Sequence, residues 1–130
     1  MTLIAITGHR PDKFGLKYGE FDDEALVTSR DREAHVEHAV RSAFREKFAQ
    51  SKPDMLFIGM ARGVDIWVAE LAVDMRIPFT ACIPCGGQLW RWGRTWTDRY
   101  LKLHSKAAKV VRTSTDYHCE PRHYKRRNAF

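Results

Sequence analysis

A short glycine turn after an apolar run is the part of this chain best suited to bind a phosphate. The run Met55–Ile58 is followed by Gly59 and Gly63, and an apolar helical pattern opens directly afterwards with Asp65 in its first turn. The first amide groups of a helix have no helical acceptor and the helix dipole is positive there, so an anion is favoured. Glycine leaves no Cβ between backbone and ligand. We expect a phosphate at this turn, although such glycines can also serve packing alone.

A second loop with groups that could hold an anion follows the first apolar run of the chain. Thr7 and Gly8 are followed by two cationic side chains, His9 and Arg10. Each can donate to a phosphate or carboxylate, and Arg10 can do so through two parallel bonds. The alternative is that both residues only cap the end of the strand.

A third loop combines tryptophans with arginines. It begins at Pro84 and contains Gln88, Trp90, Trp92 and, at the start of the next helical pattern, Trp96. Aromatic rings mixed with arginines form surfaces on which nucleobases stack. The alternative is packing on the following helix, which we prefer for Trp96 because Tyr100 and Leu103 continue its stripe. We place Gln88, Trp90 and Trp92 near the ligand.

The elements that must position these loops alternate along the chain. Four short apolar runs alternate with three helical patterns, and this order predicts parallel strands joined by right-handed crossovers. We expect one domain over residues 1–130, an α/β, Rossmann-like, three-layer parallel sheet of about four to five strands with helices on both faces. Loops after parallel strands meet at one edge, where open α/β sheets bind ligands. The first helix is predicted from Thr28 or Ser29, after a polar loop at 12–27. Residues 117–130 show no regular pattern and form a basic tail or an edge-covering segment.

The charge of the chain suits a phosphate-bearing partner. The net charge is +6 over 130 residues, which fits a small nucleotide or a nucleic acid without choosing between them. Four of the cations, Arg122, Lys125, Arg126 and Arg127, lie within six residues. A solvated tail is the alternative for that run.

The cysteines and the hydropathy pattern predict a cytoplasmic protein that does not associate with a membrane. No apolar run approaches the length of a transmembrane helix, and the first residues lack the features of a signal peptide. Three cysteines without framework spacing fit a reducing compartment. Cys82 and Cys85 have the spacing of a zinc pair, but no second close-spaced pair accompanies them, so we expect no metal and no cofactor.

Taken together, the loops resemble the SLOG superfamily, a Rossmann-like group that includes YpsA-like, DprA-like and LOG-like proteins. The likeness is to the YpsA-like branch and covers nearly the whole chain. Thr7-Gly8-His9-Arg10-Pro11, with Lys13 and Gly15, resembles its opening motif, and Gly59-Met60-Ala61-Arg62-Gly63-Val64-Asp65 resembles its central G-M-A-x-G-V-D turn. Further matches are Ala69-Glu70, Ile77-Pro78, Ile83-Pro84, Gln88 and Arg127-Asn128.

The resemblance implies binding of a nucleotide or nucleotide-derived, ADP-ribose-like ligand at the carboxyl edge of the sheet. The family pattern continues into further strands and a G-G-T loop, and the LOG-like phosphoribohydrolases carry P-G-G-x-G-T with a downstream glutamate; neither is present here. We therefore assign no catalytic residue. Two alternatives are single-stranded nucleic-acid binding, as in DprA-like relatives, and an N-glycosidase or phosphoribohydrolase using Asp65 or Glu70. The fourth strand would be an edge, which we expect a second copy or the basic tail to cover, so a homo-oligomer is predicted. The predicted ligand-binding residues are Thr7, Gly8, His9, Arg10, Gly59, Met60, Ala61, Gly63, Asp65, Pro84, Gln88, Arg127 and Asn128.

Overall fold

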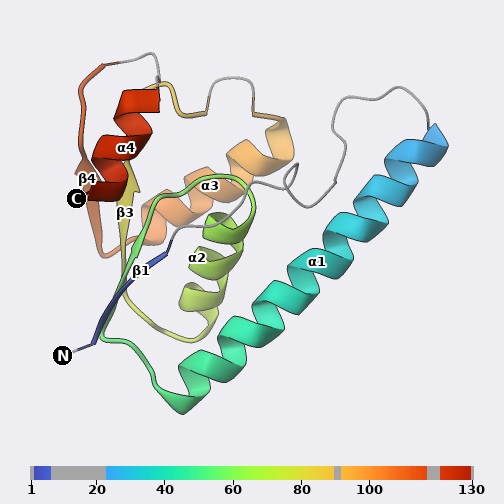
Figure 1. Ribbon diagram of the computed structural model, residues 1–130, viewed down its shortest axis with the longest axis horizontal. Coiled ribbons are helices and arrows are strands. Elements are labelled where there is room, and N and C mark those ends of the chain that lie inside the picture. Colours follow the sequence, from blue (N-terminus) through green and yellow to red (C-terminus); the bar gives the residue numbers. More distant parts are fainter. Residues whose placement is uncertain (1, 7–22, 90–91, 117–120, 130) are drawn as a thin grey trace.

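Four parallel strands form one sheet in the order β1-β2-β3-β4 (Figure 1). The structure is a computed structural model that describes residues 2–6, 23–89, 92–116 and 121–129. The strands are β1 (Leu3–Ile6), β2 (Met55–Ile58), β3 (Phe79–Ile83) and β4 (Lys109–Arg112). Each strand pairs in parallel with the next in the chain, so β1 and β4 lie at the two ends of the sheet that the described residues form.

Three crossover helices pack side by side against this sheet. They are α1 (Asp23–Gln50), α2 (Val64–Asp74) and α3 (Arg94–Lys106), and α2 contacts both of the others. Because every connection advances in the same direction across the sheet, right-handed crossovers place all three on one face. A fourth helix, α4 (Pro121–Ala129), lies on the side of the molecule away from α1 (Figure 1). The predicted Rossmann-like α/β architecture is confirmed.

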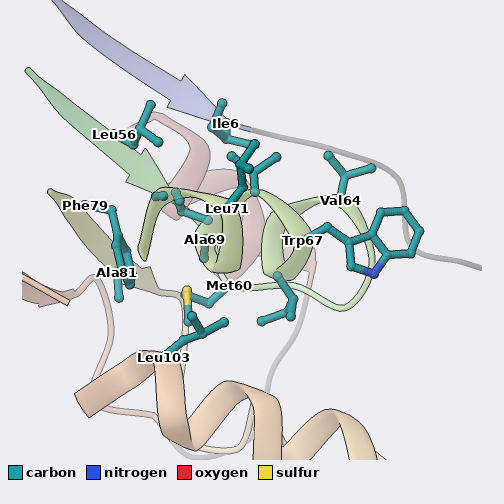
Figure 2. Close-up of a cluster of buried hydrophobic side chains, with 14 of the residues drawn as sticks. Ile6, Leu56, Met60, Val64, Trp67, Ala69, Leu71, Phe79, Ala81 and Leu103 are labelled. Atoms are coloured by element: carbon teal, nitrogen blue, oxygen red, sulfur yellow. The ribbon is translucent and has the colours of Figure 1, made fainter. Parts of the chain in front are cut away.

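The core is centred on α2 and β3. Every residue of β3 is buried, and α2 is buried around almost its whole circumference because it lies between α1, α3 and the sheet. Figure 2 shows strand side chains such as Phe79 beside Leu71 and Ala69 of α2, with Leu103 of α3 entering the same cluster from below. The hydrophobic pattern of α2 therefore reflects a central helix and not an amphipathic one. Burial of each large side chain contributes roughly 1.5–3 kcal/mol.

Two predicted boundaries differ from the structure. The first helix begins at Asp23, several residues before Thr28 or Ser29, so part of the predicted polar loop is helical. The predicted basic tail contains α4, whose first residue, Pro121, has the fixed φ suited to a helix start. Hydrophobic periodicity gave no sign of α4 because its inward positions are His123 and Arg127, which are polar.

The described helices and cysteines can be compared with the hydropathy and cysteine pattern of the sequence. Among the described residues, no helix has the length and apolar character needed to cross a membrane. Cys82 is a free buried thiol, whereas Cys85 is disulfide-bonded. The bonded state of Cys85 departs from the three reduced thiols expected from the sequence.

Candidate functional site

The glycine turn, residues 59–63, leaves the carboxyl end of β2 in an unusual backbone conformation. Met60 and Gly63 have positive φ angles of 59° and 94°, which fold the turn back on itself before α2. Gly63 is the N-cap of α2 and no side chain caps the helix there. The Asp65 carboxylate instead accepts a hydrogen bond from the Ala61 amide at 3.2 Å and braces the turn from inside.

Arg127 of α4 reaches across the sheet edge to this turn. Its Nη1 donates to the Gly59 carbonyl at 2.9 Å, its Nε donates to Asn128 Oδ1 at 3.0 Å, and its Cζ lies 5.4 Å from the centre of the Tyr124 ring. A Cβ on Gly59 would lie 2.8 Å from Cζ of Arg127, too close for any real contact. Glycine at position 59 leaves room for the guanidinium in this position, and a Cβ there would make the end of the Arg127 side chain shift.

No acid neutralises the Arg127 guanidinium within the described part of the chain. The contacts of Arg127 are a backbone carbonyl, a side-chain amide and an aromatic ring, and none is a carboxylate. The side chain is half-buried, so its charge is less solvated than that of a surface arginine. The carboxyl edge thus holds a positioned cation beside a positive helix end.

Gln88 ties the third loop to the glycine turn. Its Nε2 donates to the carbonyls of Gly59 and Met60 at 3.1 and 3.2 Å, and the residue is 5% exposed. Its Oε1 is buried and accepts no hydrogen bond from the residues that the structure describes. The amide side chain therefore fixes two loops together while one of its polar atoms stays unsatisfied.

Arg62 and Trp92 form a second contact between the same two loops. Cζ of Arg62 lies 5.7 Å from the centre of the Trp92 ring, within the range of a cation–π interaction, and Trp92 meets the Tyr100 ring edge-on at 5.6 Å. The Arg62 Nε is buried with no acceptor among the described residues. The next tryptophan, Trp96, is buried and lies against the Trp67 ring, as its stripe predicts.

Cys82 lies close enough to Arg127 and Asp65 to feel both charges. Burial raises the pKa of the Cys82 thiol, the positive charge of Arg127 opposes that rise, and Asp65 adds to it. The net direction is upward, so the thiol is held in its neutral form at neutral pH. Since the thiolate is the nucleophile, this microenvironment does not favour cysteine catalysis.

The segment after β4 anchors α4. His123 is 4% exposed and its Nε2 lies 3.0 Å from Oδ2 of Asp116, while Arg122 reaches the same oxygen at 3.5 Å. The hydrogen bond with His123 lowers the pKa of Asp116, and the charges of His123 and Arg122 act in the same direction. The Asp116 carbonyl also accepts from the Gly86 amide at 2.8 Å. Because these contacts hold α4 in place, Arg127, one helical turn beyond His123, lies within hydrogen-bond distance of Gly59.

Glu70, one of the two acids considered for catalysis, belongs to a separate cluster of charges. It accepts hydrogen bonds from Arg41 of α1 at 2.6 Å and from two nitrogens of Arg99 of α3. Glu37 of α1 pairs with both arginines. This cluster, which we call the interhelix ion ring, joins the three crossover helices and occupies Glu70 fully.

The structure brings part of the predicted site together. Hydrogen bonds join Gln88 to Gly59 and Met60, Arg127 to Gly59 and Asn128, and Ala61 to Asp65. Gly63 begins α2 at the same turn, and Pro84 is buried directly after β3. Thr7, Gly8, His9 and Arg10 lie outside the described residues, as does Trp90.

Sequence reasoning missed Arg62 and His123 as members of this region. Arg62 stands inside the glycine turn, where a cation between two glycines was a usable signal. His123 gives no such signal, because only its spacing of four residues from Arg127 links the two on a helix.

Comparisons with known proteins leave the family of this chain open. No family model matches the sequence, and no curated protein matches it. The resemblance to the SLOG superfamily therefore remains a prediction that rests on the motifs themselves.

Proposed function

We propose that this protein binds a nucleotide or a nucleotide-derived, ADP-ribose-like ligand at the carboxyl edge of its sheet, without catalysis. One observation carries the proposal: the Arg127 guanidinium is held over Gly59 with no carboxylate partner in the described structure. The adjacent start of α2 adds a partial positive charge and amides that no side chain caps. A phosphate is the group that best complements a fixed guanidinium beside a helix N-terminus.

The absence of catalysis in this proposal follows from how the acids are used. Asp65 braces the glycine turn and Glu70 is fixed in the interhelix ion ring. Neither is offered as a free general acid or base, and Cys82 is held neutral. These uses favour a binding module over the N-glycosidase or hydrolase alternative.

The test uses Gly59 to move Arg127 without removing its charge. Binding of nucleoside mono- and diphosphates and of ADP-ribose is measured by calorimetry and by thermal shift. We expect Gly59→Ala to weaken binding at least tenfold because the new Cβ displaces the guanidinium. Gly93→Ala is the matched control, since a Cβ there meets nothing within 4 Å.

A second pair of variants tests whether the position of the cation on α4 matters, or only the number of cations. Arg127→Gln removes the proposed phosphate contact, whereas Arg126→Gln removes an exposed cation from the same helix. We expect loss of nucleotide affinity for the first variant only. Equal affinity in all four variants, or no binding of any phosphate compound by the parent protein, contradicts the proposal.

The outer surface of α4 favours nucleic-acid binding as a second candidate function. Arg122, Lys125 and Arg126 follow an i, i+3, i+4 spacing and are exposed. Lys125 and Arg126 have no acidic partner in the described region. A phosphodiester backbone on this stripe would give steep salt dependence, and each cation replaced would reduce the salt slope by about one. Affinity for oligonucleotides that does not change with salt contradicts this candidate.

Three further expectations remain part of the proposal. We infer that the protein belongs to the YpsA-like branch of the SLOG superfamily, that it resides in the cytoplasm and that it forms a homo-oligomer through a sheet edge. Counting alkylatable thiols in rapidly acidified cells tests the compartment. A protein that stays in the cytoplasm should carry Cys85 largely as a thiol there, because that compartment reduces disulfides.

A further inference from the structure

Arg62 and Gln88, at the carboxyl edge, each carry a buried polar atom that has no hydrogen-bond partner among the described residues. These atoms are Nε of Arg62 and Oε1 of Gln88. Buried polar atoms in native proteins almost always have a partner, so each exception calls for an explanation. One of these atoms is a donor and the other is an acceptor.

The protein's own contacts fix both atoms in place. The Gln88 Nε2 donates to two carbonyls, and this decides which end of the amide is the oxygen, because a reversed amide would set three oxygens together. The Arg62 guanidinium lies over the Trp92 ring. Arg62 belongs to the glycine turn, and Trp92 lies four residues after Gln88 in the third loop. The donor and the acceptor thus stand on two loops that are already joined.

We propose that Arg62 and Gln88 recognise the base of the nucleotide, with the Gln88 Oε1 accepting from an amino or ring N–H group and the Arg62 Nε donating to a ring nitrogen or carbonyl. This inference rests on the proposed function. The edge of a nucleobase presents a donor beside an acceptor, as adenine does with its amino group and ring nitrogen. The guanidinium of Arg62 itself lies over the Trp92 ring, so this contact holds the Arg62 side chain beside the third loop. Arg127 would hold the phosphate and this pair the base.

The experiment compares a nucleoside monophosphate with ribose 5-phosphate, which carries the same phosphate and sugar without a base. Both affinities are measured by calorimetry on the full chain. We expect the nucleotide to bind roughly 5- to 100-fold more tightly, the range expected when otherwise unsatisfied buried groups gain partners. Arg62→Met should bring the nucleotide to the affinity of ribose 5-phosphate and leave the affinity for ribose 5-phosphate unchanged.

Further variants keep the test decisive. Arg62→Lys retains the charge but lacks Nε, so it should behave like Arg62→Met if the hydrogen bond is what matters. Gln88→Met should also lower the affinity for the nucleotide, but it removes the hydrogen bonds to the carbonyls of Gly59 and Met60 as well, so Arg62→Met carries the test of base specificity. Arg94→Met, at a side chain that is 95% exposed, is the control and should change neither affinity.

The outcomes separate this inference from the proposed function. The proposal that Arg62 and Gln88 recognise the base is overturned if the parent binds the two ligands equally tightly. It is also overturned if Arg62→Met lowers the affinities for both ligands by the same factor. If Arg127→Gln then still abolishes binding of both ligands, the phosphate site stands on its own. If neither ligand binds the parent protein, both proposals fail.

Discussion

The two glycines of the glycine turn, Gly59 and Gly63, serve different structural purposes. Gly59 is needed for the close approach of Arg127, whereas Gly63 is needed for a backbone angle that other residues rarely adopt. A substitution at Gly59 therefore tests the ligand site, while one at Gly63 tests the fold as well. Met60 shares the left-handed region without being glycine, so some backbone strain is held next to the proposed ligand.

We expect Gly63→Ala to lower the free energy of unfolding by about 1–3 kcal/mol, because φ near 94° is unfavourable for any residue with a Cβ. Chemical denaturation measures the change. Gly93→Ala, at a glycine with an ordinary extended φ, should cause a smaller loss. A Gly63→Ala protein as stable as the parent contradicts the backbone assignment.

At the scale of elements, α2 is buried on nearly all sides, so the carbonyl groups of its last turn need hydrogen-bond partners within the protein. Its last turn closes with two hydrogen bonds, from the Ile77 amide to Ala72 and from the Arg76 amide to Val73. This is the Schellman pattern, in which the left-handed position is usually glycine. Here Arg76 occupies it with a φ of 58°.

Arg76→Gly should therefore stabilise the protein by roughly 0.5–1 kcal/mol, since the left-handed conformation costs an L-residue about that much or more. Thermal and urea unfolding report the gain. Arg76→Ala is the matched comparison, because it shortens the side chain but retains the Cβ, and it should give no stabilisation. A loss of stability in Arg76→Gly contradicts the prediction.

The interhelix ion ring should contribute more than an ordinary surface pair. Glu70 and Arg99 are each 24% exposed and share several hydrogen bonds, so Glu70→Gln leaves two arginines poorly paired. We expect a loss of about 1.5–3 kcal/mol, the range for hydrogen bonds to charged groups. Asp98→Asn breaks the exposed pair with Arg94 and should change stability by less than about 1 kcal/mol. Similar losses in the two variants would contradict this ranking.

The contact between Asp116 and His123, which holds α4 in place, predicts that stability depends on pH in the acid range. The hydrogen bond from His123 lowers the pKa of Asp116 below the ordinary value of 3.8. A carboxyl group whose pKa is lowered by folding stabilises the folded state at pH values above its ordinary pKa. This contribution is lost as the pH falls through the pKa of the folded state. The stability difference between the parent and Asp116→Asn should thus shrink as the pH falls below about 4. A difference that persists at low pH contradicts this assignment.

The sequence predicted the strands, their parallel order and the glycine turn because these features follow from apolar runs and glycine spacing. It did not predict α4, since a helix that docks through His123 and Arg127 has no apolar stripe to detect. Nor could it predict the left-handed Met60, because side-chain type does not report backbone angles. The unsatisfied atoms of Arg62 and Gln88 depend on contacts between distant loops, which only the folded chain reveals.

At the scale of the whole molecule, the net positive charge predicts that salt strengthens the association of two copies and weakens the binding of nucleic acid. Each copy carries a net charge of +6, so two copies repel one another and screening should favour their association. Light scattering should show a shift from 15.1 kDa towards twice that mass as salt and protein concentration rise. Nucleic-acid binding should weaken over the same range. A mass of 15.1 kDa throughout contradicts the predicted homo-oligomer.

The bond between Arg127 and Gly59 joins residues 68 positions apart and has a consequence for biosynthesis. While the ribosome is still making α3 and β4, the glycine turn has already been produced, but the cation that faces it has not. Under the proposed function, a phosphate-bearing ligand therefore cannot assist the folding of the emerging sheet, because Arg127 is translated late. The early folding of β1 to β3 therefore proceeds without the contact to Arg127, and the proposed phosphate site is complete only once α4 has docked.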